Sequence, residues 1–361
     1  MRPFFFLALL SLLISCKSEQ APQDQFFEDE NDQFIYSGRI LKTAEGTKLI
    51  TSASSVKSNV YGDTVTVFLQ SDNEQQHYVA IELNQEYIGR FRILKDTLKF
   101  PLPKKDSANT LVIYKETEAA NGAVIFNGIR AGKIGNLTFQ KRQKIEFIGD
   151  SITCGMGADT TEVGCEDGEW FDHHSAYMAY GPRVARALEV DFEVNCVSGM
   201  GMYRNWNDED QPVMPDVYPY LHLNGNHGKR AEIDKKNPPD VVSIALGTND
   251  FSLGDGDNIR PDFDAEKFKD NYVKFVEAIF KKYPETQVAL LSSPMTGEAE
   301  GLALSKILHE VKAELPERAI SIFEFEKFNG RGCTNHPSVD DHKIMADRLT
   351  PFYKDLLQKN Q

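Results

Sequence analysis

The sequence predicts two domains of different class, a β-sandwich followed by a three-layer α/β domain built around a parallel sheet of five strands. Short runs in the N-terminal part alternate apolar and polar residues with period two. After about residue 140, compact apolar runs alternate instead with segments of helical spacing. At 361 residues, the chain is long enough for each domain to bury a core of its own.

The predicted sandwich covers residues 34–140. Its alternation is clear at Val65, Val67 and Leu69, and similar runs recur at intervals as far as Ile113. Clusters of Asp, Asn, Gly and Pro separate the runs, as expected for short, half-buried strands joined by turns. No segment before about residue 140 has the length and periodicity of a helix.

The predicted α/β domain covers residues 141–361. Its five buried strands are expected at residues 145–148, 192–197, 241–246, 288–291 and 320–325. The segments between them have helical spacing, which favours helices packed on both faces of a parallel sheet. The functional site of such a sheet lies at the carboxyl ends of its strands. The residues that directly follow the strands are therefore the candidates for function.

The first sixteen residues have the pattern of a bacterial lipoprotein signal peptide. Arg2 precedes an apolar run at residues 4–14 that is too short to span a membrane as a helix. The run ends in Leu13-Ile14-Ser15-Cys16, which resembles a lipobox with Cys16 as the lipidated residue. An ordinary signal peptide with a chance cysteine is the alternative. The lipoprotein interpretation predicts an exported protein, periplasmic or surface-facing, attached to a membrane only through its N-terminal lipid.

Acidic residues dominate the charge of the chain. Residues 17–33 are polar and acidic without periodicity, so they are expected to form a flexible tether. The formal net charge of the whole chain is −14. A surface of this sign repels phosphate backbones, which excludes nucleic acid as a partner and favours a neutral substrate.

Four cysteines remain beyond the signal peptide: Cys154, Cys165, Cys196 and Cys333. Disulfides are possible in an exported protein, but the sequence does not rank the pairings. Cys196 lies in an apolar, strand-like run, which favours a buried free thiol.

Polar motifs follow four of the five predicted strands. Gly149-Asp150-Ser151 comes after the first, Ser198-Gly199 after the second, Gly247-Thr248-Asn249-Asp250 after the third and Asn335-His336-Pro337 after the fifth. Gly-Asp-Ser alone is a common turn sequence. The four motifs together, each placed just past a strand, indicate one site.

This set of motifs resembles the SGNH hydrolase superfamily, also called GDSL-type esterases, over about residues 142–361. Within it, residues 149–155 and 198–205, and the pair His336-Pro337, are similar to the family 2 carbohydrate esterases. The resemblance implies an N-terminal jelly roll and an enzyme that removes O-acetyl groups from polysaccharides of the acetyl xylan or glucomannan type. It implies no cofactor and no metal. The expected partner is therefore an acetylated polysaccharide or oligosaccharide.

Ester hydrolysis through a serine needs a base and an oxyanion hole. Ser151 is the predicted nucleophile, and His336 is the base that takes its proton as an acyl-enzyme forms. The resemblance assigns the oxyanion to the backbone N–H groups of Ser151 and Gly199 and to the side-chain amide of Asn249.

One position departs from the superfamily pattern. The usual aspartate three residues before the catalytic histidine is replaced by Cys333. We therefore expect a Ser-His dyad in which a backbone carbonyl of residues 333–335 holds the Nδ1–H of His336. Asp340 or Asp341 as the orienting acid is the alternative.

Three aromatic residues are predicted to bind substrate: Trp170, Trp206 and Tyr203. The two tryptophans lie in polar loops beyond strand ends, which suits stacking against a sugar. His342, inside an opening helix, is expected to cap or to face solvent. His173, His174, His222 and His227 lack carboxylates or cysteines at ligand spacing, so no metal site is predicted.

Two other functions remain as alternatives. The first is a GDSL-type lipase or esterase that acts on lipids or small esters, although the polar loop at 199–237 favours a hydrated substrate. The second is a non-catalytic surface lipoprotein that binds glycans. The complete set of Ser151, Gly199, Asn249 and His336 argues against that second alternative.

Overall fold

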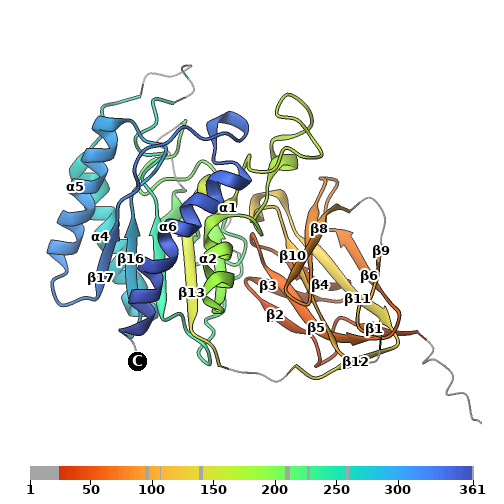
Figure 1. Ribbon diagram of the computed structural model, residues 1–361. Coiled ribbons are helices and arrows are strands. Elements are labelled where there is room, and N and C mark those ends of the chain that lie inside the picture. The colour runs from red at the N-terminus through yellow and green to blue at the C-terminus, as the bar shows by residue number, and fades with distance from the viewer. Residues whose placement is uncertain are drawn as a thin grey trace, which may run out of the picture.

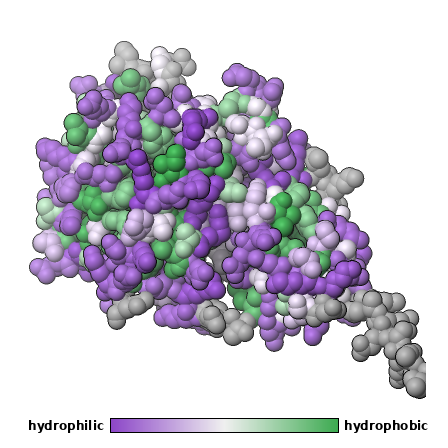
Figure 2. Space-filling view, viewed as in Figure 1, coloured by the Kyte–Doolittle hydropathy of each residue, from purple (hydrophilic) through white to green (hydrophobic). Residues whose placement is uncertain are grey.

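The computed structural model describes residues 24–93, 97–105, 107–137, 141–207, 212–225, 228–254, 256 and 260–359. The predicted signal peptide and Cys16 lie outside these residues. Figure 1 shows a β-rich domain beside an α/β domain, in the order that the sequence predicts. Hydrophilic residues cover most of the visible face of both domains (Figure 2). Among the described residues, no helix is long and apolar enough to cross a membrane.

The N-terminal domain is a sandwich of two antiparallel sheets, as predicted. One sheet has the order β3-β4-β11-β6-β9, with β1 also paired to β11; the other has the order β12-β5-β10-β7-β8, with β2 paired to β5. Val65, Val67 and Leu69 point into the shared core, which confirms the predicted alternation. The strands are β1 (Gln25–Glu28), β2 (Ile35–Ser37), β3 (Ile40–Thr43), β4 (Gly46–Leu49), β5 (Ser55–Tyr61), β6 (Thr64–Ser71), β7 (Tyr78–Leu83), β8 (Glu86–Arg92), β9 (Thr97–Pro101), β10 (Asn109–Lys115), β11 (Val124–Ala131) and β12 (Lys133–Gly135).

The predicted tether is wrong for the part of it that the structure describes. Within residues 24–33, β1 pairs antiparallel with β11. The Phe26 ring meets Phe68 edge to face at 5.0 Å, and Phe27 packs against the sandwich core. Two adjacent phenylalanines thus anchor an otherwise polar segment that composition alone marks as flexible. Residues 17–23 lie outside the described part of the chain.

The second domain has a five-stranded parallel sheet in the order β14-β13-β15-β16-β17. Helices α2 and α6 pack on one face and α4 and α5 on the other, which gives the predicted three layers. The strands are β13 (Lys144–Gly149), β14 (Asp191–Cys196), β15 (Val241–Ala245), β16 (Gln287–Leu291) and β17 (Ile320–Phe323). The helices are α1 (Ser151–Cys154), α2 (Tyr180–Leu188), α3 (Met214–Val217), α4 (Ala265–Lys282), α5 (Glu298–Glu314) and α6 (Val339–Gln358), with short 3₁₀ turns at Ala119–Asn121, Trp170–His173 and Cys333–Asn335.

Polar contacts join the two domains. Arg39 of the sandwich is buried and donates to the carbonyls of Tyr218 and Tyr220. The Tyr78 hydroxyl donates to Asp172 at 2.8 Å. The α/β domain also covers the outer side of β7, where Tyr177 packs in one cluster with Ala80 and donates its hydroxyl to Glu82. All six residues of β7 are therefore buried, rather than the alternate residues expected of a solvated strand.

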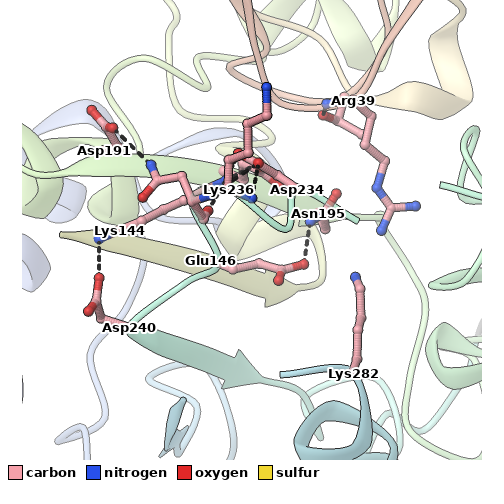
Figure 3. Close-up of polar contacts among 12 residues, drawn as sticks. Arg39, Lys144, Glu146, Asp191, Asn195, Asp234, Lys236, Asp240 and Lys282 are labelled. Atoms are coloured by element: carbon pink, nitrogen blue, oxygen red, sulfur yellow. Dashed lines mark hydrogen bonds and ion pairs between the residues drawn. The ribbon is translucent and has the colours of Figure 1, made fainter. Parts of the chain in front are cut away.

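A groove of about 1610 Å³ lies between the domains at the amino ends of the parallel strands. Figure 3 shows its polar lining, with Arg39 from the sandwich and with Lys144, Glu146 and Lys282 from the α/β domain. Lys144 is the first residue of β13, whereas Ser151 follows the last. The groove is therefore at the opposite end of the sheet from the predicted catalytic residues.

Candidate active site

Ser151 stands at the carboxyl end of β13, where the chain turns sharply into α1. The Asp150 side chain accepts the N–H of Ile152 at 3.0 Å and so caps this short helix. Gly149 is required just before, because a Cβ there would lie 2.1 Å from Thr153 Oγ1 and 2.9 Å from the Ala245 carbonyl. The tight turn places the serine hydroxyl at the carboxyl end of the parallel sheet.

The structure brings His336 to Ser151 although 185 positions separate them in the chain. The distance from His336 Nε2 to Ser151 Oγ is 2.8 Å, which is a hydrogen bond. Burial lowers the pKa of His336 below its ordinary value of 6.5. The imidazole is therefore neutral near pH 7, and its Nε2 is free to accept the hydroxyl proton.

Thr334 sets the orientation of the imidazole. Its hydroxyl donates to the Cys333 carbonyl at 2.7 Å, so the oxygen accepts from His336 Nδ1 at 2.9 Å. The Thr334 carbonyl, at 3.3 Å from the same nitrogen, is the kind of contact that the sequence predicts. The Thr334 hydroxyl was not predicted, and it is the shorter contact. Both acceptors favour the tautomer with Nδ1 protonated and Nε2 facing Ser151.

The alternative orienting acids are engaged elsewhere. Asp341 forms an ion pair with Arg331 at 2.7 Å and accepts the Ser338 hydroxyl at 2.8 Å. These partners hold the pKa of Asp341 at about 2, and its carboxylate belongs to the N-terminal cap of α6. Asp340 is exposed. Within the described part of the chain, no carboxylate hydrogen-bonds His336.

Two backbone donors stand ready at the predicted oxyanion hole. The N–H groups of Ser151 and Gly199 meet no acceptor among the described residues. Gly199 has φ of +79°, and a Cβ there would lie 2.6 Å from the Trp206 ring, so only glycine fits. The Asn249 amide instead donates to the Met200 carbonyl at 2.8 Å and to Asp150 at 3.2 Å. Asn249 would therefore have to exchange or share a hydrogen bond in order to meet an oxyanion.

Asp250, which follows β15, braces the loop that follows β14. Its buried carboxylate accepts the backbone N–H groups of Met202, Tyr203 and Arg204 at 2.8 to 3.2 Å. Burial nevertheless raises its pKa to about 6.

Two disulfides flank the predicted catalytic residues, and the predicted free thiol at Cys196 is wrong. Cys154 pairs with Cys196 and Cys165 pairs with Cys333. Cys154 lies three residues after Ser151, and Cys333 lies three residues before His336. An apolar run hides a disulfide as readily as a free thiol, so only the three-dimensional arrangement reveals the pairing. The two bonds tie the nucleophile turn and the histidine loop to their neighbours.

The predicted aromatic residues separate into two groups. Trp206 covers Gly199 and is 43% exposed, and Trp170 is 42% exposed, so both side chains are accessible to a ligand. Tyr203 is only 2% exposed, and its hydroxyl accepts the Asp264 N–H. Because Tyr203 packs in the core against Phe268, its predicted role in substrate binding is wrong.

His342 is buried rather than facing solvent. Its Nδ1 accepts the N–H of Tyr180, the first residue of α2, at 3.3 Å. The side chain therefore caps α2 from α6, which corrects the predicted solvent-facing position and leaves a capping role on a different helix. Burial lowers the pKa of His342 to about 3, so the ring stays neutral. Of the other histidines, His227 lies outside the described residues.

Comparison with known proteins agrees with this architecture. Residues 147–326 match the GDSL-like Lipase/Acylhydrolase family, and residues 36–138 match the Carbohydrate esterase 2 N-terminal family. The chain is 30% identical over 346 residues to the cellulase/esterase CelE of Acetivibrio thermocellus, covering 93% of this chain and 41% of that protein. It is 32% identical over 215 residues to an acetylxylan esterase / glucomannan deacetylase of Cellvibrio japonicus, covering 58% of each. The chain thus spans about half the length of these relatives.

Solved structures share both domains. The fold matches a family two carbohydrate esterase from Clostridium thermocellum, determined in complex with cellohexaose, with a TM-score of 0.78, 29% identity and coverage of 90% of this chain and 99% of that one. A family two carbohydrate esterase from Cellvibrio japonicus has a TM-score of 0.80 at 22% identity, covering 93% and 98% of the two chains. The chain therefore contains a GDSL-like lipase/acylhydrolase domain preceded by a carbohydrate esterase 2 N-terminal domain, which is the two-domain organisation of the family 2 carbohydrate esterases.

Proposed function

We propose that this protein is an exported serine esterase that removes O-acetyl groups from polysaccharides of the acetyl xylan or glucomannan type. The observation that carries the proposal is the 2.8 Å contact between Ser151 Oγ and His336 Nε2, with two unpaired backbone N–H groups beside it. A nucleophile, a neutral base and oxyanion donors are the parts that acyl transfer requires.

The geometry supports a two-step reaction. In the first step Ser151 Oγ attacks the acetyl carbonyl while His336 Nε2 takes the hydroxyl proton. The oxyanion that forms is held by the N–H groups of Ser151 and Gly199. As the intermediate collapses, the ester bond breaks and the protonated His336 gives its proton to the departing sugar hydroxyl. Water then attacks the acetyl-serine with His336 again as base, which releases acetate and restores Ser151.

The substrate class rests on relatives and on surface character. Relatives of this chain are named acetylxylan esterase / glucomannan deacetylase, and both tryptophans are exposed to solvent. Trp206 lies against Gly199, and the Trp170 ring is 5.0 Å from His174. Exposed indole rings favour the flat faces of sugars. Export through a lipid anchor at Cys16 is part of the proposal and rests on the sequence of residues 1–16.

An acetate-release screen tests this function. The mature protein and its S151A variant would be incubated with acetylated xylan, acetylated glucomannan, a small acetyl ester and an octanoyl ester. We expect the wild type to release acetate from at least one of the polysaccharides and S151A to release none. Hydrolysis of the octanoyl ester alone would support the lipase alternative instead. Binding of a polysaccharide without hydrolysis would indicate a glycan-binding protein. Radiolabelled palmitate incorporation, compared with a C16A variant, tests the anchor.

A further inference from the structure

A carboxylate from the sandwich domain reaches the loop that carries the predicted oxyanion donor. Glu118 lies between β10 and the Ala119–Asn121 turn, and its side chain is only 1% exposed. Its Oε2 accepts the backbone N–H of Ser198 at 2.8 Å. Ser198 directly precedes Gly199, whose unpaired N–H lies at the predicted oxyanion hole. A residue outside the α/β domain thus contacts the loop at the carboxyl end of β14, where the predicted site lies.

Glu118 is itself held firmly. Its backbone carbonyl accepts the Lys115 ammonium at 2.9 Å and the Asn121 N–H at 3.2 Å. Its carboxylate also lies against the Cys154–Cys196 disulfide, with Oε2 2.9 Å from Cys154 Sγ. Both sulfurs are in a disulfide, so this cluster is no metal site. The carboxylate therefore contacts the disulfide beside the nucleophile turn and the loop that follows β14.

The loop needs such support because of its own sequence. Gly199 has a left-handed backbone and no side chain, and its own N–H has no acceptor among the described residues, so hydrogen bonds of its neighbours set the direction of that N–H. One of them is the turn closed by the Met200 N–H on the Val197 carbonyl at 3.3 Å, and another is the bond of Ser198 to Glu118. The Ser198 N–H is the last donor before it, and without Glu118 this donor would be left without its hydrogen bond. An oxyanion hole works through donors that are already in place when charge develops. A small rotation at Ser198 would turn the next peptide away from that position.

We propose that Glu118 is a positioning residue for the oxyanion hole, through which the sandwich domain becomes part of the catalytic apparatus. The inference rests on the proposed esterase function. It also predicts that the α/β domain without the sandwich retains Ser151 and His336 but loses a fixed Gly199 N–H.

Glu116 provides a matched control two residues away. It is also fully buried, and its Oε2 accepts the Tyr177 N–H at 2.9 Å. This bond likewise joins the sandwich to the α/β domain, but at the segment that enters α2 rather than at the oxyanion loop. Substitution of either glutamate should weaken the contact between the domains. Only substitution of Glu118 should misplace the Gly199 N–H.

The experiment compares E118M, E118Q and E116M in the full chain. Methionine keeps the volume and removes the acceptor, while glutamine keeps an oxygen for the Ser198 N–H. We expect E118M to lower kcat for a small acetyl ester by about 30- to 100-fold with KM changed less than about threefold, as for loss of transition-state stabilisation alone. E118Q should recover kcat to within about fivefold of wild type, and E116M should stay within about threefold. Hydrogen exchange read by mass spectrometry should show faster exchange at residues 197–202 in E118M only.

The possible results distinguish a failure of the proposed role of Glu118 from a failure of the proposed esterase function. An equal loss of kcat in E116M and E118M, or unchanged kcat and unchanged exchange at 197–202 in E118M, would overturn the role of Glu118. If E118M does not fold, E118Q with kcat reduced as far as in S151A would overturn it as well. If the wild type hydrolyses no ester, the proposed function fails, and the exchange at 197–202 still decides whether Glu118 holds the loop.

Discussion

At the scale of single residues, Thr334 holds the ring of His336, the predicted base, without a carboxylate. Its hydroxyl is committed as a donor to the Cys333 carbonyl, so it presents only a lone pair to His336 Nδ1. A hydroxyl fixes the tautomer but carries no charge to stabilise the imidazolium that would form in the proposed reaction. The backbone at Thr334 has φ of +54°, a region that β-branched residues rarely adopt, and this conformation places the side chain beside the ring.

The hydroxyl can be tested with an isosteric substitution. T334V removes the acceptor and keeps the branched shape, so kcat should fall by about tenfold while T334S stays within about threefold of wild type. D341N is the control, because Asp341 binds Arg331 and Ser338 rather than the ring. It should reduce activity less than about tenfold, compared with about 10⁴ for loss of a true triad aspartate. A thousandfold loss in D341N with the fold intact would reveal an orienting acid that the structure does not show.

The pH profile tests the environment of His336. Burial lowers the pKa of His336, so the neutral base persists to a lower pH than an exposed histidine would allow. Activity should therefore be lost as the pH falls through a midpoint below 6.5, read from the acid limb of kcat/KM for a small ester. A T334D variant should move this midpoint upward, because a carboxylate near Nδ1 favours the charged ring. A wild-type midpoint above 6.5 would contradict this account.

At the scale of elements, the two disulfides restrain the loops around the site, as hydrogen bonds in the sheet restrain its strands. The Cys154–Cys196 bond joins α1 to the end of β14, and the Cys165–Cys333 bond joins the loop before Trp170 to the histidine loop. Each bond therefore fixes one predicted catalytic residue relative to a distant segment. Together they restrict the two loops whose relative position sets the contact between Ser151 and His336.

Removing one bond should show this restriction. A C165A/C333A variant should lose roughly 2–4 kcal/mol of unfolding free energy, measured by urea denaturation. It should also lose kcat, because the loop that carries Thr334 and His336 is freed. A variant as stable and as active as wild type would show that the Cys165–Cys333 bond contributes to neither property.

The elements also show which parts of the fold can be predicted from sequence patterns. Period-two runs and apolar runs predicted the sandwich and all five strands of the parallel sheet, because burial on one or two faces leaves a direct periodicity. The motifs after the strands predicted that Ser151 and His336 would meet. β1 was missed because two phenylalanines are too short a signal in an acidic segment. The buried positions of Tyr203 and His342 depend on contacts with distant helices, which no local pattern records.

At the scale of the whole molecule, the two domains behave as one structural unit around the site. Buried polar side chains of the sandwich, among them Arg39, Arg90, Glu116 and Glu118, hydrogen-bond to backbone groups of the α/β domain. Such pairs are far apart in the chain and leave no sequence signature. The sandwich was therefore predicted as a separate domain, and its contact with the oxyanion loop came only from the structure.

At the same scale, we expect the site to prefer short acyl groups. The Trp206 ring lies against Gly199, and a bulky ring beside the predicted oxyanion hole should disfavour a long acyl chain. We expect kcat/KM to be highest for acetyl esters and to fall steadily across a series from two to eight carbons. A maximum at eight carbons or longer would contradict a polysaccharide deacetylase.

The most direct test of the central claim is acetate release by the wild type and by S151A from acetylated xylan and glucomannan. We predict release by the wild type and a loss of at least about a thousandfold in S151A, with the fold retained by circular dichroism. We also expect a fluorophosphonate to label Ser151 in the wild type and to label no residue in S151A. Retention of more than about a tenth of wild-type turnover by S151A would contradict a serine nucleophile at this position.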